Sequence, residues 1–303
     1  IFFMTKLLSV NSYIEAARAG AAGAGFLIIA KEIGSMSDRS EAINQKNVEN
    51  LAQTNEHINA IAGMHIADMA FDLIDKVDRN LSERNSDIQA WATFESVKEF
   101  LEHPNDKSRE RVTVLLKNLC KMYIVYSDLI LANKEGVICA VSNSEQLLGS
   151  DVSGRPWFKA VKTSMNTIVS DLYYSDIFEK YVINFATPVV DENGVFLGVL
   201  SSRFNWEYIY DILDKTKVGA TTDVFIVNSN GDVIAAKNRD DVFKLHIKNN
   251  PAVKTIISRE LDYGYHINQL SDGKVKNITG FAITKGYNNY AGKGWAGIVI
   301  ENF

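Results

Sequence analysis

Apolar residues recur every three or four positions through the first third of the chain, which is the period of an α-helix. Between about Ser35 and Leu101 they form one narrow stripe, and the other faces carry Glu, Asp, Lys, Arg and Asn. Such a stripe is typical of a coiled coil or of a long helix that lies along a domain. We expect this helix to end at His103-Pro104, either unbroken or interrupted near Gly63, and a second amphipathic helix to cover residues 108–123.

Small residues gather just before this stripe. Residues 11–26 predict a helix, then a bend with glycine at positions 20, 23 and 25, then a second helix. Small side chains allow two antiparallel helices to turn back with their backbones close together. The pattern therefore predicts a helical hairpin, although an Ala/Gly-rich turn alone occurs in many hairpins of this kind.

From about residue 127 the pattern changes to that of β-strands and turns. The expected strands lie at residues 127–132, 137–142, 167–173, 182–190 and 195–204, with a helix at 157–164. Asn133-Lys134-Glu135-Gly136 and Asp191-Glu192-Asn193-Gly194 are turn sequences between neighbouring strands.

A shorter version of the same pattern follows. Its expected helices lie at residues 207–215 and 253–260, and its expected strands at 223–228, 233–237, 277–283 and 295–301. The repeat predicts two tandem α/β modules, each a sheet with helices on one side. The expected fold class is therefore α+β, with long N-terminal helices before the two modules.

Composition argues against several classes of function. The net charge of −5 over 303 residues offers no basic surface for nucleic acid. Cys120 and Cys139 make no disulfide framework and no metal site by spacing, and the five histidines form no metal pattern. No apolar run approaches the ~20 residues of a membrane span. Because nucleotide-binding and nucleophile motifs are also missing, we expect no enzyme activity, no catalytic residues, no metal and no cofactor.

The first forty residues carry a longer motif, built from Phe3, Asn11, the run Ile14-Glu15-Ala16-Ala17-Arg18-Ala19-Gly20, and Gly25-Phe26. The segment resembles the hairpin tip of bacterial methyl-accepting chemotaxis receptors, although Ala21 and Ala24 replace residues that are usual there. The resemblance implies a chemotaxis coupling protein and a histidine kinase as partners. It also implies contacts between receptor dimers through Phe3, Asn11, Glu15 and Arg18.

A second set of motifs lies further along, at Gly154-Arg155-Pro156-Trp157-Phe158, in the strand–turn–strand run 188–200, and at the closing run 294–300. With them, residues 71–303 resemble the double Cache sensor of chemoreceptors, sensor kinases and cyclases, which consists of two PAS-like modules. The resemblance implies a small-molecule site in the first module, formed by Arg155, Trp157, Phe158, Tyr173, Asp176 and Arg203.

The departures from that family bear on the ligand. Phe158 and Ser150 stand where amino-acid-binding members carry tyrosine, and Arg203 stands where they carry an aspartate for the ligand's ammonium group. Because a cation repels an amine and attracts an anion, we expect an organic anion or carboxylate rather than an amino acid. Structural roles remain alternatives: Arg155 paired with Asp151, Trp157 in the core, and Arg203 in solvent.

Together these resemblances imply a chemoreceptor that signals to a histidine kinase through its tip. The expected parts are a tip fragment at 1–45, a helical connector at 46–101, a ligand-binding Cache module at 102–215 and a second Cache module at 216–303. We expect a homodimer or a trimer of dimers.

The chain opens on Ile1 inside the first motif, so we expect it to be a fragment of a longer protein. With no span between the tip and the sensor, we expect a cytoplasmic chain that associates with membrane receptor arrays. The alternative is a Cache sensor module that feeds a cyclase or a histidine kinase outside these residues. A hydrolase that uses the cavity is a more remote alternative.

Overall fold

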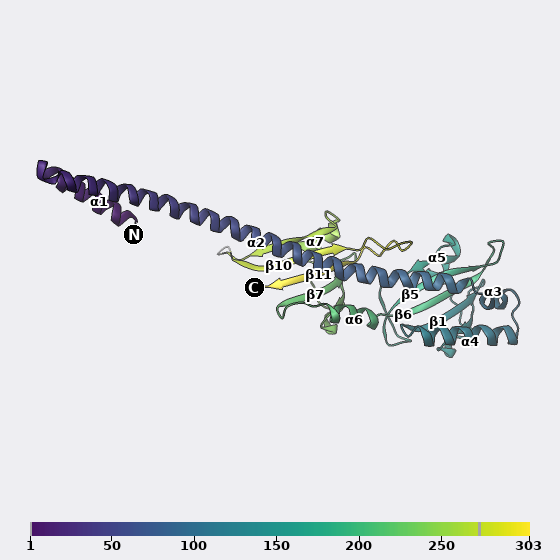
Figure 1. The fold of residues 1–303 in the computed structure, drawn as a ribbon. Coiled ribbons are helices and arrows are strands. Elements are labelled where there is room, and N and C mark those ends of the chain that lie inside the picture. Colours follow the sequence, from purple (N-terminus) through teal and green to yellow (C-terminus); the bar gives the residue numbers. More distant parts are fainter. Residues whose placement is uncertain (1, 272–273) are drawn as a thin grey trace. The chain divides into compact units, whose positions relative to one another are not determined.

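The computed structural model describes residues 2–271 and 274–303 (Figure 1). They fall into two compact units, Ile1–Ala62 and Gly63–Phe303. The finer boundaries expected at residues 45, 101 and 215 stay predictions. The α+β class is confirmed, because long helices precede two antiparallel sheets that carry helices of their own.

The first unit contains the expected helical hairpin. Helix α1 (Phe2–Arg18) and the beginning of helix α2 (Ala24–Ala92) are joined by the short 3-10 helix η1 (Gly20–Gly23). The Ser9 hydroxyl of α1 donates a 2.7 Å hydrogen bond to the Ala30 carbonyl oxygen of α2. The two helices therefore lie in direct contact.

Small residues are required at this bend. A Cβ atom at Gly23 would lie 2.1 Å from the carbonyl oxygen of Ala16, so only glycine lets the chain turn this tightly. Beyond the hairpin, α2 continues with almost no covering side chains over residues 41–62. Its apolar residues there are more than half exposed, namely Ile43, Val48, Leu51, Ile58 and Ile61.

In the second unit α2 runs without a break through Gly63 to Ala92, so the interruption considered at Gly63 does not occur. Its buried residues recur at the predicted spacing, and they include Ala67, Ala70, Ile74, Val77, Leu81 and Ile88. The helix ends earlier than expected. A turn at Thr93 separates it from α3 (Glu95–Glu102), and a capping box of Asn105 with Ser108 begins α4 (Asp106–Met122).

The first sheet has the strand order β2-β1-β6-β5-β3, with β4 also paired to β5. Its strands are β1 (Tyr126–Asn133), β2 (Ile138–Val141), β3 (Ile168–Val169), β4 (Tyr173–Ser175), β5 (Lys180–Val190) and β6 (Phe196–Asn205). Between β2 and β3 lie the 3-10 helix η2 (Glu145–Leu147) and the helix α5 (Pro156–Ser164). Ala186 of β5, Val199 of β6 and Phe158 of α5 share one buried cluster, so α5 covers this sheet.

The single strand expected at 167–173 was wrong, because two short strands replace it. Ser170 interrupts them: its backbone N–H donates to the Asn184 carbonyl oxygen, while its hydroxyl accepts the Asn184 N–H, both at 2.9 Å. The Ser170 hydroxyl thus takes the place of a backbone carbonyl oxygen in the hydrogen-bond ladder with β5. The chain then leaves β5 and rejoins it at β4, which leaves the segment between them free to line a cavity.

The second sheet has the order β8-β7-β11-β10-β9. Its strands are β7 (Thr222–Val227), β8 (Val233–Ala236), β9 (Tyr263–Gln269), β10 (Val275–Ile283) and β11 (Ala296–Asn302). The helices of this module are α6 (Glu207–Lys215), η3 (Arg239–Asp241) and α7 (Pro251–Ser258). The repeat of helix and strands seen in the sequence therefore corresponds to two sheets of related construction.

Strand β9 was not predicted. It is an edge strand, and α2 covers its side chains Tyr263 and Tyr265. The Tyr263 hydroxyl donates a 2.6 Å hydrogen bond to Asp68, and the Tyr265 ring lies so close to Gly63 that a Cβ there would meet it at 2.3 Å. The covering residues are nearly two hundred positions away, so the local pattern gave no sign of them.

Helix α2 rests directly on the backbone of the second sheet, as Figure 1 shows. A Cβ at Gly280 of β10 would lie 2.5 Å from the Ala67 nitrogen, and a Cβ at Gly297 of β11 would lie 2.5 Å from the Ala70 carbonyl oxygen. Ala67 and Ala70 are fully buried. Paired small residues thus hold this stretch of helix at close range.

Candidate ligand-binding cavity

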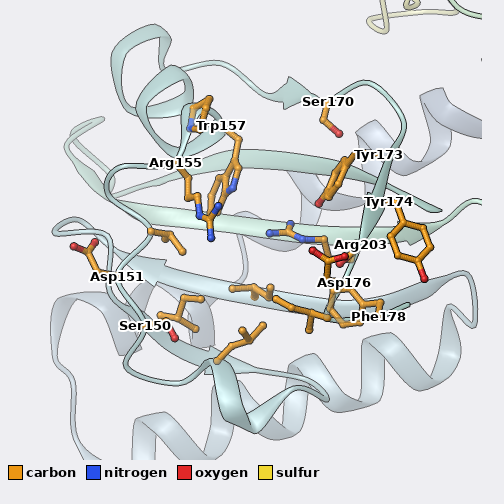
Figure 2. Close-up of a pocket in the computed structure, with 17 residues that line it drawn as sticks. Ser150, Asp151, Arg155, Trp157, Ser170, Tyr173, Tyr174, Asp176, Phe178 and Arg203 are labelled. Carbon is orange, nitrogen blue, oxygen red and sulfur yellow. The ribbon is translucent and has the colours of Figure 1, made fainter. Parts of the chain in front are cut away.

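A cavity of about 740 Å³ opens on the helical face of the first sheet. Its walls are strands β1, β2 and β6, the beginning of α5, and residues 170–178, which we name the rim segment. The volume is within the range of small-molecule sites. Figure 2 shows the lining side chains turned toward the same space.

Arg155 and Trp157 reach the cavity because α5 begins beside it. Arg155 is the residue before the helix, with extended backbone, and Pro156 occupies the first helical position. Within the described chain, the Arg155 side chain has no hydrogen-bond or ion-pair partner. The alternative pairing with Asp151 does not form, and Asp151 instead accepts the Ser153 N–H at 2.8 Å.

Arg203 of β6 projects from the floor of the cavity and is 9% exposed. Its Nη1 donates to Asn184 Oδ1, to the Ser201 hydroxyl and to the Ser202 carbonyl oxygen. The Trp157 ring covers it, with 5.4 Å from Cζ to the ring centroid. The solvent-exposed alternative for Arg203 is therefore wrong.

The charge on Arg203 is only partly balanced. Burial lowers its pKa, Tyr173 and Asp128 oppose that shift, and the nearby Arg155 guanidinium adds to it, although a guanidinium stays charged at any physiological pH. Asp128, its neighbour across the ladder, is fully buried but accepts its hydrogen bonds from Ser142, Asn143 and Ser144. Among the residues the structure describes, no carboxylate forms an ion pair with Arg203.

Figure 2 shows the guanidinium groups of Arg155 and Arg203 pointing toward one another across the cavity. Tyr173 lies beside Arg203, whereas the Tyr174 ring points away from the pair. Asp176 lies on the same side of the cavity as these tyrosines. The arrangement offers two convergent cations, an indole wall and a phenol.

Five of the six residues expected at the site line this cavity together: Arg155, Trp157, Tyr173, Asp176 and Arg203. The sixth, Phe158, does not line it. Its ring is 1% exposed and packs edge-on against Trp157 at 5.9 Å and against Phe196 at 6.3 Å. Consecutive residues of a helix point in different directions, so Phe158 packs against the Trp157 ring without facing the cavity itself.

Other lining residues were not expected, among them Ile138, Leu147, Asp151, Ser170, Ile177 and Phe178. Those of the rim segment lie within five positions of Tyr173 in the sequence, and this closeness to a predicted site residue was a usable signal. Ile138 and Leu147 belong to β2 and η2, which only the folding of the sheet brings beside α5.

The four tip residues of the first unit are all solvent-exposed, and Phe3 is 77% exposed. Arg18 pairs with Glu15 at 2.8 Å on the surface of the hairpin. No contact of these side chains holds the unit itself together, which leaves them available to other molecules.

Across residues 2–271 and 274–303, no group of three or more His, Cys, Asp or Glu side chains is arranged to hold a metal ion. The helices of this described part include none with both the length and the apolar character needed to cross a membrane.

The sequence model of the Cache domain family, dCache_1, matches residues 28–299. The chain is also 25% identical over 115 residues to the methyl-accepting chemotaxis protein McpA of Pseudomonas putida, an alignment that covers 38% of this chain and 18% of McpA. The chain spans about a fifth of the length of the curated relatives it matches.

Two solved structures share the fold. The ligand-binding domain of the Campylobacter jejuni chemoreceptor Tlp3, in complex with L-valine, has a TM-score of 0.58 at 15% identity and covers 79% of this chain and 92% of its own. The extracellular domain of rpHK1S-Z16, described as a histidine kinase, has a TM-score of 0.60 at 15% identity, and the match covers 84% of this chain and 96% of that domain. Because the family match extends over most of the sequence and the fold agrees with it, the chain belongs to the Cache domain family.

Proposed function

We propose that this chain is the sensory part of a chemotaxis receptor and that its cavity binds a small organic anion rather than an amino acid. The relation to methyl-accepting chemotaxis proteins and the fold shared with Tlp3 support the receptor role. Arg155, Trp157, Tyr173, Asp176 and Arg203 would contact the ligand. Phe158 would act by holding Trp157 in place.

The observation that carries the anion proposal is the unpaired cation at Arg203. A buried charge without a partner is costly, and a bound carboxylate would supply the missing opposite charge. The two guanidinium groups also present planar forks of donors that suit carboxylate oxygens. An amino acid such as the L-valine bound by Tlp3 adds an ammonium group, which Arg203 would repel.

The test is a thermal-shift screen of the purified chain against mono- and dicarboxylic acids and the common amino acids, followed by calorimetry on each compound that raises Tm. We expect organic acids to stabilise the chain and amino acids to leave Tm unchanged. Arg203→Met should weaken binding of the stabilising acid on the order of 100-fold, since truncating one partner of a buried charge pair costs several kcal/mol. Lys159→Met, on the exposed face of α5, is the matched control.

Arg203→Met is expected to fold, because replacing a buried unpaired charge with an apolar side chain is often neutral or stabilising. Loss of binding with an unchanged or higher Tm would therefore report on the ligand contact itself. Stabilisation by amino acids without any response to organic acids would reject the anion proposal. Stabilisation by neither class would reject a role for this cavity in sensing those compounds.

Signal output would use the first unit. Phe3, Asn11, Glu15 and Arg18 are exposed on the hairpin, as contacts with other receptor dimers require. We propose that the hairpin meets a chemotaxis coupling protein and a histidine kinase, and that the chain forms a homodimer or a trimer of dimers. Co-purification with a coupling protein that is lost in Phe3→Ala but kept in Lys46→Ala would support this role.

The second candidate is a Cache sensor that feeds a signalling enzyme outside these residues, because rpHK1S-Z16 has the same fold. The fold serves both classes, whereas the helical hairpin favours the receptor. Cytoplasmic location remains a prediction, and cell fractionation of the full-length protein would test it.

A further inference from the structure

The loop between β10 and β11, residues 284–295, touches two distant parts of the second unit. It is ordered by its own backbone. The Thr284 N–H donates to the Trp295 carbonyl oxygen at 2.7 Å, and Tyr287 and Tyr290 exchange hydrogen bonds of 2.8 and 3.0 Å. The loop is thus a defined hairpin with fixed ends, able to pass a displacement along its length.

One end of this loop holds the rim of the cavity. Lys293 Nζ donates a 3.0 Å hydrogen bond to the Val169 carbonyl oxygen and lies 3.5 Å from Asp171 Oδ1. The Lys293 side chain is only 20% exposed. Ser170, which lines the cavity, lies between the two residues that Lys293 contacts.

The other end holds α2. The Gly286 N–H donates to Asp78 Oδ2 at 2.9 Å, and the Ser82 hydroxyl donates to the Tyr287 carbonyl oxygen at 3.0 Å. The Arg79 guanidinium lies 4.5 Å above the centre of the Tyr287 ring. Three residues within about one turn of α2 therefore contact one short stretch of loop.

The middle of the loop is buried but polar and incompletely satisfied. Tyr290 is 5% exposed, and its hydroxyl has no hydrogen-bond partner among the described residues; within that same part of the chain, Asp78 Oδ1 and the Thr284 hydroxyl are likewise buried without partners. Burial raises the pKa of the Tyr290 phenol, and the negative charges of Asp78 from the α2 side and Asp171 from the rim side raise it further. Buried polar groups without hydrogen-bond partners cost free energy. A rearrangement that gives these three groups partners would therefore lower the free energy of the contact between the loop and α2.

We propose that loop 284–295 couples the rim segment to α2, so that a change in the position of the rim alters how the loop holds the helix. Lys293 would carry the coupling at the rim and Asp78 would carry it at α2. Ligand control of this coupling rests on the proposed function. The coupling itself is a property of the free protein and is tested without ligand.

The test is amide hydrogen exchange on the whole chain, read at two amides. The Gly286 N–H reports the bond to Asp78, and the Ser170 N–H reports the attachment of the rim to β5. Lys293→Met should speed exchange at Gly286, and Asp78→Ala should speed exchange at Ser170, each by about fivefold or more, because coupling between two sites is reciprocal. Exchange is measured at Gly286 for Lys293→Met and at Ser170 for Asp78→Ala, so each variant is tested at the end of the loop that its substitution does not contact.

Two controls separate coupling from general loosening. Lys248→Met breaks a 2.6 Å ion pair with Asp232 in the same module and should change neither amide. Asp78→Asn keeps an oxygen to accept the Gly286 N–H and should leave Ser170 unchanged. If Asp78→Ala fails to fold, the Lys293→Met result at Gly286 still decides.

Unchanged exchange at Gly286 in Lys293→Met, with faster exchange at Ser170, would overturn the proposal, since the contact would then be local. A second arm uses whichever organic acid raises Tm in the screen above: it should slow exchange at both amides, and at Ser170 alone in Lys293→Met. Failure of every acid in the screen would count against the proposed function, whereas the ligand-free arm would still decide the coupling.

Discussion

Two buried charged side chains of the second unit differ in how they are held. Arg203 stays charged at the cavity and donates hydrogen bonds to polar neighbours, but no carboxylate of the described residues forms an ion pair with it. Asp78 lies 3% exposed beneath the loop 284–295 and accepts backbone N–H groups of Gly286 and Lys285. Burial outweighs those donors and, with a smaller contribution from Asp75, raises the pKa of Asp78 to about 6.

The raised pKa of Asp78 predicts a stability that depends on pH. The folded protein binds the proton more tightly than the unfolded chain, whose Asp pKa is about 3.9. The contribution of Asp78 to stability is therefore largest below about pH 4, falls as the pH rises toward about 6, and stays at the lower level above that. Asp78→Asn should raise the unfolding free energy at pH 7.5 by roughly 1–3 kcal/mol and hardly change it near pH 4.

The measurement is denaturant unfolding of both proteins between pH 4 and pH 8, with Asp72→Asn, on the exposed face of the same helix, as control. A difference between Asp78→Asn and the parent chain that does not change with pH would contradict the assignment.

At the scale of elements, the contact between α2 and the second sheet depends on the absence of side chains. Gly280 and Gly297 meet Ala67 and Ala70 with their backbones almost in contact. Larger residues at either partner would separate the helix from the sheet. Strands β10 and β11, which carry these two glycines, are joined by the loop 284–295. The contact between α2 and the sheet therefore also fixes the geometry that the proposed coupling uses.

Gly297→Val should destabilise the chain by about 1–3 kcal/mol, because the new side chain overpacks a site with no room. Gly25→Ala, at the beginning of α2 in the first unit, meets nothing within 4 Å and should be neutral or slightly stabilising. Thermal unfolding of the two variants side by side measures the contrast. An unchanged Tm in Gly297→Val would mean that α2 does not pack there as described.

At the scale of the whole molecule, residues 41–62 of α2 carry apolar side chains that the described part of the chain leaves exposed. Val48, Leu51, Asn55 and Ile58 follow the 3-4 spacing of a coiled-coil seam, and the apolar ones among them are more than half exposed. An asparagine within such a seam favours a defined register and a two-stranded assembly. This pattern supports the proposed homodimer.

We expect sedimentation equilibrium to show a dimer for the parent chain, and Leu51→Lys with Ile58→Lys to shift it to monomer, because buried like charges would face each other at the seam. Glu49→Lys with Glu56→Lys, off the seam, is the matched control. A parent chain that stays monomeric at micromolar concentration would contradict the homodimer.

The elements themselves were largely predictable. The periods of three to four and of two, the turns ending in Gly136 and Gly194, and the stop at His103-Pro104 are local signals, and each corresponds to an observed boundary within a few residues. Strand β9 and the split at Ser170 were not predictable. Their causes are α2 for the first and Asn184 for the second, and neither partner is a neighbour in sequence.

The sequence by itself determined most of the helices and strands, that two modules repeat, and which residue types gather near α5, because these follow from local period and from motifs of adjacent residues. Only the tertiary structure decided that Arg203 faces Arg155 across a cavity, that Phe158 lies behind Trp157, and that Lys293 and Asp78 hold the ends of one loop. Those relations depend on burial and distance between residues far apart in the chain, which periodicity does not encode.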